Sequence, residues 1–122
     1  MMQKLIYLVL ILVCGTGAFA ESPLELRDTC KNGLKALDVA DNMHASVQQM
    51  MTRQQDTGHC IGYINAVADD LESIGGLCLP AGVSNRTFAE QYIGFAEHYP
   101  GHFDLAYGMV RLMLQERFPC KK

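Results

Sequence analysis

Four cysteines restrict the folds open to this 122-residue chain more than any other feature of its sequence. They are Cys30, Cys60, Cys78 and Cys120, and the fifth cysteine, Cys14, lies in an apolar N-terminal segment. An even number of cysteines in a small exported domain predicts a disulfide framework. Two bridges would use every thiol after residue 20, so none would remain as a nucleophile or a metal ligand.

Residues 1–20 have the pattern of a cleavable secretory signal peptide. Lys4 supplies a positive charge, residues 5–13 form the apolar run LIYLVLILV, and AFA (18–20) places small residues at the cleavage site. The apolar run is less than half the roughly 20 residues that a membrane-spanning helix needs. We therefore expect export to the periplasm, a single helical domain over residues 21–122, and no membrane attachment after cleavage.

The charge of the exported part argues against nucleic acid as a partner. Removing residues 1–20 takes away one lysine, so the formal net charge changes from −3 to −4. Nucleic-acid binding rewards clustered lysine and arginine, which neutralise phosphates. A protein partner with a basic surface remains compatible with this charge.

Proline and glycine divide the remaining sequence into pieces whose apolar residues recur with helical spacing. The predicted helices span approximately residues 22–37, 41–58, 60–74, 84–99 and 105–118. Ser22 and Ser84 are good helix caps, and Pro100 ends the fourth helix because the residue before a proline resists the helical conformation. No alternating run is long enough for a strand, so the sequence predicts an all-α, disulfide-bonded bundle of about five helices.

Apolar stripes indicate which helix faces should be buried. The stripe within residues 60–74 is the clearest. In the predicted second helix, Met43, Val47, Met50 and Met51 fall on one face. Methionines at helical spacing usually fill cores, so we expect this face to be buried as well.

The helices also predict which cysteines pair. Cys60 and Cys78 would lie about 25 Å apart along a straight helix over residues 60–74, whereas a disulfide needs Cα atoms within about 7 Å. The short turn between the last two helices predicts that they lie antiparallel, which returns Cys120 to the end of the molecule that holds Cys78. The expected disulfides are therefore Cys30–Cys60 and Cys78–Cys120.

Candidate catalytic and metal-binding residues are few, and we expect no cofactor, no metal site and no enzymatic activity. The chain has no CxxC pair, and Pro100 breaks the helix that would align His98 with His102. His102 and Asp104 match half of a hydrolase dyad by residue type only. Asp104 is also available as a cap for the last helix.

Several short motifs, in order, resemble those of the Tai/Rap immunity proteins. They are CIGYI (60–64), CLPAGVS (78–84), YP (99–100), AYGMV (106–110) and FPC (118–120). The resemblance covers roughly residues 57–120, whereas residues 31–57 match no motif and form a longer connection than is usual in the family. It implies a helical, commonly dimeric, non-enzymatic periplasmic protein that obstructs the cleft of a cognate peptidoglycan amidase, a toxin of the type VI secretion system. The motif cysteines at 60, 78 and 120 carry over as structural positions.

An inhibitor of this kind needs a rigid projection, and two segments are candidates. They are the turn HYPGHF (98–103) and the acidic stretch DDLESIGG (69–76). The candidate toxin-binding residues are Asp69, Asp70, Glu72, Tyr99, His102 and Phe103. The carboxylates share a helix with Leu71 of the core stripe, so we expect them in solvent, where they can steer a basic partner. For the two aromatic residues, burial at the helix junction is an equally open interpretation.

A second hypothesis is a small periplasmic chaperone of the acid-stress type, or another helical binding module. Such a chaperone would need a surface that becomes apolar and exposed at low pH. Four histidines and a net charge of −4 after cleavage do not single out that property. A hydrolase is disfavoured because the predicted disulfides leave no free thiol.

Overall fold

The computed structural model describes residues 21–121, and those residues form helices joined by turns, with no strand among them. In chain order the helices are α2 (Pro23–Lys35), α3 (Val39–Asn42), α4 (Val47–Ser73), α5 (Asn85–His98) and α6 (Ala106–Arg117). The all-α prediction is confirmed. The predicted signal peptide, residues 1–20, lies outside the described residues.

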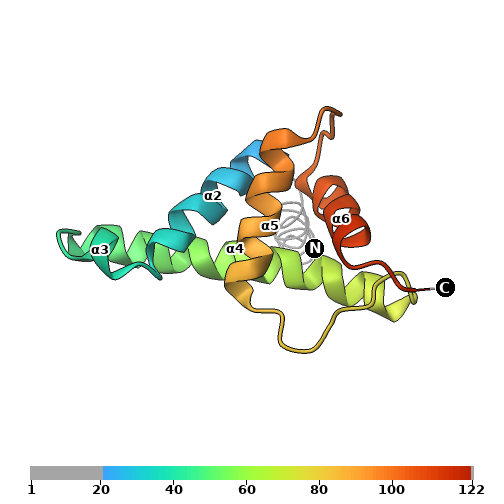
Figure 1. Cartoon of the computed structure of the whole chain (residues 1–122). Coiled ribbons are helices and arrows are strands. Elements are labelled where there is room, and N and C mark those ends of the chain that lie inside the picture. The colour runs from blue at the N-terminus through green and yellow to red at the C-terminus, as the bar shows by residue number, and fades with distance from the viewer. Residues whose placement is uncertain (1–20, 122) are drawn as a thin grey trace, which may run out of the picture.

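The long helix α4 is the element on which the others are arranged (Figure 1). Helices α2, α5 and α6 all contact α4 and also contact one another. Their shared core contains apolar side chains from all four helices. Its fully buried members include Leu26, Ile64, Val67, Leu71, Tyr92, Val110, Met113 and Leu114.

Three serines begin the longer helices that precede α6. The hydroxyl groups of Ser22, Ser46 and Ser84 each accept a hydrogen bond from the backbone N–H three residues later, at 3.1–3.2 Å. Such caps satisfy N–H groups that have no partner within the helix. The predicted starts at Ser22 and Ser84 are confirmed. Ser46 also forms a capping box with Gln49, so α4 begins there.

The predicted break between the second and third helices is wrong. Residues 54–58 continue as helix, and α4 runs without interruption for 27 residues. A glycine such as Gly58 costs a helix only about 1 kcal/mol. A contact with α2 offsets this cost: the hydroxyl of Thr57 donates to the carbonyl oxygen of Gly33 at 2.7 Å.

The predicted burial of the methionine face is also wrong. Met43, Val47, Met50 and Met51 are exposed. The side of α4 that faces α2 here is polar, since Asp56 accepts a hydrogen bond from the side chain of Asn32 at 2.7 Å. Helix α3 has no buried residue, so no described helix covers the apolar side chains.

The disulfides are Cys30–Cys60 and Cys78–Cys120, the pairing that the sequence predicts. The first joins α2 to the middle of α4 within the core, where both cysteines are 1% exposed. The second joins the linker after α4 to the chain beyond α6, at the surface. Each bridge therefore holds together segments that lie far apart in the sequence.

Gly33 allows the close crossing of α2 and α4, and Gly33→Ala is expected to destabilise the fold by about 1–3 kcal/mol. A Cβ atom there would lie 2.8 Å from both the backbone N and the Cα of Thr57, and backbone cannot rotate aside as a side chain can. At Gly58 a Cβ would have no neighbour within 4 Å. Gly58→Ala is therefore the matched control, with an expected gain of up to about 1 kcal/mol. Urea unfolding of both variants tests this expectation, and a stabilised Gly33→Ala would contradict it.

Candidate functional site

The two predicted projections lie at opposite ends of α6. The turn 98–103 immediately precedes α6, whereas Cys120, beyond its other end, places its Sγ atom 3.7 Å from the carbonyl oxygen of Gly75 in the acidic stretch. A helix of 12 residues is about 18 Å long. The six candidate residues therefore form two separate groups.

The acidic group occupies the last turns of α4. Asp69, Asp70 and Glu72 are exposed, whereas Leu71 between them is buried in the core. The three carboxylates thus lie in solvent, as the position of Leu71 in the apolar stripe predicts. They form a small negative surface on the last turns of α4.

The aromatic group forms a stack that fixes the turn. The ring centroids of Phe95 and Tyr99 are 5.2 Å apart, and those of Tyr99 and Phe103 are 5.6 Å apart, with interplanar angles of 16° and 27°. Tyr99 and Phe103 are half-buried, so each rests on the core and keeps part of its surface in water. A Cβ at Gly101 would lie 2.5 Å from the ring of Tyr99, and one at Gly108 would lie 2.7 Å from the ring of Phe103. These two positions need glycine because the rings occupy the space.

His102 is the most accessible of the candidate residues in this turn. Its side chain is 87% exposed, and its Nε2 atom lies 3.0 Å from Oδ1 of Asp104. Asp104 bonds to this histidine and does not cap α6, so the predicted cap is wrong. The first N–H of α6, at Ala106, instead donates to the carbonyl oxygen of Glu21 at 2.7 Å.

Glu21 connects three parts of the molecule. Its backbone carbonyl oxygen accepts the hydrogen bond from α6, and its carboxylate lies 2.5 Å from Nε2 of His59 on α4. The next residues begin α2. These contacts hold the first turn of α2 beside the turn that precedes α6.

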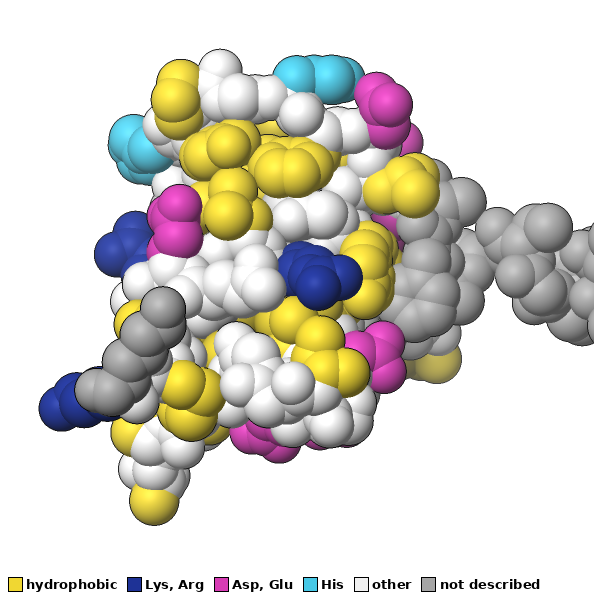
Figure 2. Space-filling view, turned by 90° about the vertical axis from the view of Figure 1, so that its right-hand side faces the viewer, with side chains coloured by type: hydrophobic (Ala, Val, Ile, Leu, Met, Phe, Trp, Pro, Cys, Tyr) yellow, Lys and Arg dark blue, Asp and Glu magenta, His cyan; other side chains and the backbone are white. Residues whose placement is uncertain are grey.

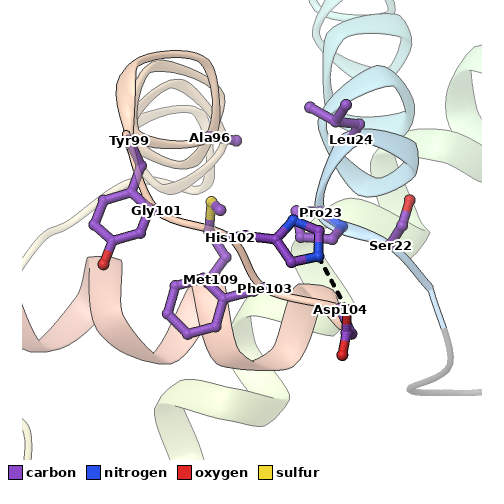
Figure 3. Close-up of a pocket in the computed structure, with 10 residues that line it drawn as sticks. All are labelled: Ser22, Pro23, Leu24, Ala96, Tyr99, Gly101, His102, Phe103, Asp104 and Met109. Carbon is purple, nitrogen blue, oxygen red and sulfur yellow. Dashed lines mark hydrogen bonds and ion pairs between the residues drawn. The ribbon is translucent and has the colours of Figure 1, made fainter.

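A groove of about 350 Å³ lies between these two segments (Figure 3). Ala96 and Met109 contribute apolar surface from α5 and α6, and Pro23 contributes it from α2. His102 extends from the turn toward the start of α2, and its bond to Asp104 borders the groove. The groove thus combines an apolar interior with exposed polar groups at its edge, as small binding sites commonly do.

Sequence reasoning found only part of this groove. Tyr99, His102 and Phe103 were candidates, but Ser22, Pro23 and Leu24 were not. The first turn of α2 is separated from the turn 98–103 by more than 70 residues, and no local pattern indicates that they meet. Only the packing of α2 against α5 brings them together.

Tyr92 anchors the start of α2 on α5. It is fully buried, and its hydroxyl donates to the carbonyl oxygen of Pro23 at 2.7 Å. Burial raises the pKa of Tyr92, and burial likewise raises the pKa of Tyr63 to about 12. Both phenols therefore remain protonated in the folded chain at pH values where unfolded tyrosines, with a pKa of about 10, ionise.

Tyr92→Phe is expected to destabilise the chain by about 1 kcal/mol at pH 7, because a buried hydrogen bond is lost. Above about pH 10 the wild-type chain should lose stability as pH rises, since unfolding then releases protons from the buried tyrosines. The variant has one such group fewer, so its stability should fall less steeply. Urea unfolding from neutral pH to pH 11 measures both slopes. Equal slopes would mean that Tyr92 does not contribute to the loss of stability above pH 10.

Neither a free cysteine thiol nor a metal-binding cluster occurs among the residues that the structure describes. The four cysteines within residues 21–121 are all in disulfides. In that part of the chain, no three His, Cys, Asp or Glu side chains are arranged to hold a metal ion.

The face of the molecule that carries α6 presents the α5–α6 turn to solvent (Figure 2). Hydrophobic side chains gather in its upper part, and histidine and acidic side chains border them. This upper part corresponds to the α5–α6 turn, which projects beyond the ends of both helices in Figure 1. An apolar centre with a polar border is the usual composition of a protein contact surface.

Comparison with known protein families gives a match to most of the chain. A family model described as Rap1a immunity proteins matches residues 24–120. This range includes residues 31–57, for which the sequence motifs offered no counterpart. No curated protein and no solved structure matches the chain.

Proposed function

Because this chain belongs to the Rap1a immunity protein family, whose members protect against effectors of the type VI secretion system, we propose that it inhibits a cognate peptidoglycan amidase in the periplasm by occluding the active site. Family membership makes the chain an inhibitor and not an enzyme. It also favours immunity over the chaperone function that the sequence alone left open.

We choose this contact surface because stacked aromatic rings order the turn 98–103 beside the groove. Binding loses less entropy when the contacting segment is already ordered. Phe95, Tyr99 and Phe103 order the turn before any partner arrives. His102 then offers an exposed side chain that can enter the cleft of the toxin, and the groove can receive a side chain from the rim of that cleft.

The acidic group has a different role in this proposal. Asp69, Asp70 and Glu72 lie at the far end of α6 from the turn, so they do not share its contact centre. Exposed charges of one sign accelerate the encounter with an oppositely charged surface. We assign these carboxylates to steering a toxin whose active-site rim is basic.

The periplasmic location is supported by two features. The N-terminal segment has the pattern of a signal peptide, and both disulfides suit an oxidising compartment. None of the helices described for residues 21–121 has the length and apolar character needed to cross a membrane.

The test uses the amidase encoded beside the gene for this chain. Residues 21–122 should form a stable complex with that amidase and abolish its release of peptide stems from purified peptidoglycan. Export of the chain should also protect cells in which the amidase is directed to the periplasm. Full amidase activity in the presence of excess chain would overturn the proposal.

A further inference from the structure

The two disulfides of this chain differ in their access to solvent. Cys30 and Cys60 are each 1% exposed, and the bond between them lies in the core between α2 and α4. Cys78 is exposed and Cys120 is half-buried, so the bond between these two lies at the surface. A thiol in solution can therefore reach the second bond in the folded chain, whereas the first becomes accessible only when the core opens.

The second disulfide fastens the C-terminal segment, residues 118–121, to the linker after α4. This segment runs alongside the end of α4 (Figure 1). The backbone N–H of Cys78 donates to the carbonyl oxygen of Phe118 at 3.2 Å, and the ring of Phe118 packs edge-on against Phe88 of α5, with ring centroids 5.8 Å apart. None of residues 118–121 is fully buried, whereas Leu77 of the linker is 5% exposed and belongs to the core. Opening the bond would thus free the C-terminal segment while Leu77 holds the linker in place.

We propose that Cys78–Cys120 is a thiol-exchange site, which a dithiol reduces while Cys30–Cys60 stays intact and the helical core stays folded. Exposed disulfides are the labile ones in proteins, and they include those with regulatory roles. The reductant is a dithiol of the kind that thiol–disulfide oxidoreductases carry in their Cys-X-X-Cys motifs. The chain then has two covalent states, one with the C-terminal segment fastened and one with it free.

The reaction transfers two electrons from the dithiol to the disulfide. One thiolate of the dithiol attacks Sγ of Cys78, the more exposed cysteine of the pair, and the bond between the two Sγ atoms breaks. Cys120 leaves as a thiolate and takes up a proton. The second thiolate of the dithiol then attacks the dithiol sulfur of the mixed disulfide, which releases Cys78 and leaves the dithiol as a cyclic disulfide. The two protons that the dithiol loses equal the two that the cysteines gain.

The surroundings of Cys120 favour its release as a thiol. Its Sγ atom lies 3.7 Å from the carbonyl oxygen of Gly75. A thiol can donate a weak hydrogen bond to such an oxygen, whereas a disulfide sulfur has no proton to donate. The contact therefore becomes a hydrogen bond only after reduction, so it stabilises the thiol form of Cys120.

The main experiment treats wild-type residues 21–122 with dilute dithiothreitol, alkylates the free thiols at intervals and locates them by mass spectrometry. Cys78–Cys120 should be reduced at least about 100-fold faster than Cys30–Cys60, because the buried bond reacts only in molecules that have transiently opened. In urea that unfolds the chain, the two rates should become similar. Equal rates in the folded chain would overturn the proposal, as would faster reduction of Cys30–Cys60.

A monothiol identifies the sulfur that is attacked. Reduced glutathione has no second thiol to complete the reaction, so the mixed disulfide accumulates. The glutathione should be found on Cys78, with Cys120 alkylated as the free thiol. Glutathione found mainly on Cys120 would contradict the assignment of Cys78 as the exposed, attacked sulfur.

The selectively reduced chain shows what the bond holds. Its helix content should equal that of the oxidised chain, while hydrogen exchange at the amide of Cys78, measured by NMR, should become at least about tenfold faster. Amides in the middle of α5 and α6 should be unaffected. Loss of helix content, or unchanged exchange at Cys78, would overturn the proposal.

The variant Cys78→Ala with Cys120→Ala is the matched control for the buried bond. If it folds as expected, Cys30–Cys60 should resist dithiothreitol in it as it does in the wild type. Rapid reduction of Cys30–Cys60 in this variant would mean that the core opens once the second bond is lost, and would overturn the proposal. None of these measurements uses the amidase, so their outcome is independent of the proposed function.

Discussion

His102→Glu is expected to weaken inhibition of the cognate amidase about 30-fold or more while leaving the fold intact. The side chain is 87% exposed and bonds only to Asp104, so the folded chain does not depend on it. In the complex it would lie in the centre of the contact, where losing one anchor costs about 2 kcal/mol or more, which corresponds to about 30-fold in affinity. The glutamate also brings an unpaired charge into a desolvated contact.

Inhibition constants and urea unfolding curves together test this expectation. Arg86→Glu is the control, because Arg86 is exposed in the first turn of α5, at the opposite end of that helix from the turn. It introduces the same carboxylate and should leave inhibition unchanged. Equal inhibition by His102→Glu and the wild type would mean that the turn 98–103 is not part of the contact surface.

Loss of either disulfide is expected to have the largest effect on stability. Replacing Cys78 and Cys120 with alanine opens a loop of 42 residues, which costs about 4 kcal/mol in the chain-entropy model. Whole domains are stable by only about 5–15 kcal/mol. Without the disulfide, the C-terminal segment would keep only non-covalent contacts with the linker after α4, such as the hydrogen bond that the backbone N–H of Cys78 donates to the carbonyl oxygen of Phe118 at 3.2 Å.

The buried pair should be the more costly one to replace. Cys30→Ala with Cys60→Ala opens a shorter loop, of 30 residues, so the entropic cost alone would be slightly smaller. Both sulfur atoms lie in the core, however, and their removal leaves a cavity that adds about 1 kcal/mol or more. Urea unfolding should therefore show a larger loss for this pair than for Cys78 and Cys120. A smaller loss would mean that loop length outweighs packing here.

Much of the framework could be predicted because it depends on local geometry. The rise of an α-helix per residue is fixed, so the impossible bridge between Cys60 and Cys78 could be excluded from spacing alone. Serine caps at residues 22 and 84 act on N–H groups three residues away. These rules operate within a single helix, and a single sequence contains all that they need.

The candidate site could be predicted only in part. Tyr99, His102 and Phe103 follow one another closely and could be grouped from the sequence. The groove also needs Ser22 and Pro23, and the pairing of Tyr92 with Pro23 joins residues 69 positions apart. No local pattern encodes a contact of that kind.

The sequence by itself determined that the chain is helical and where two of its helices begin, because both follow from the local geometry of the backbone. It also determined which cysteines pair, because helix length excludes one bridge and the short turn between the last two helices returns Cys120 to Cys78. The tertiary structure alone decided that Gly58 continues a helix, that the methionine face is exposed, and that α6 separates the two candidate projections. The physical reason is that burial depends on which helix lies opposite. The apolar spacing of Met43, Val47, Met50 and Met51 is that of a core face, but no described helix packs over it.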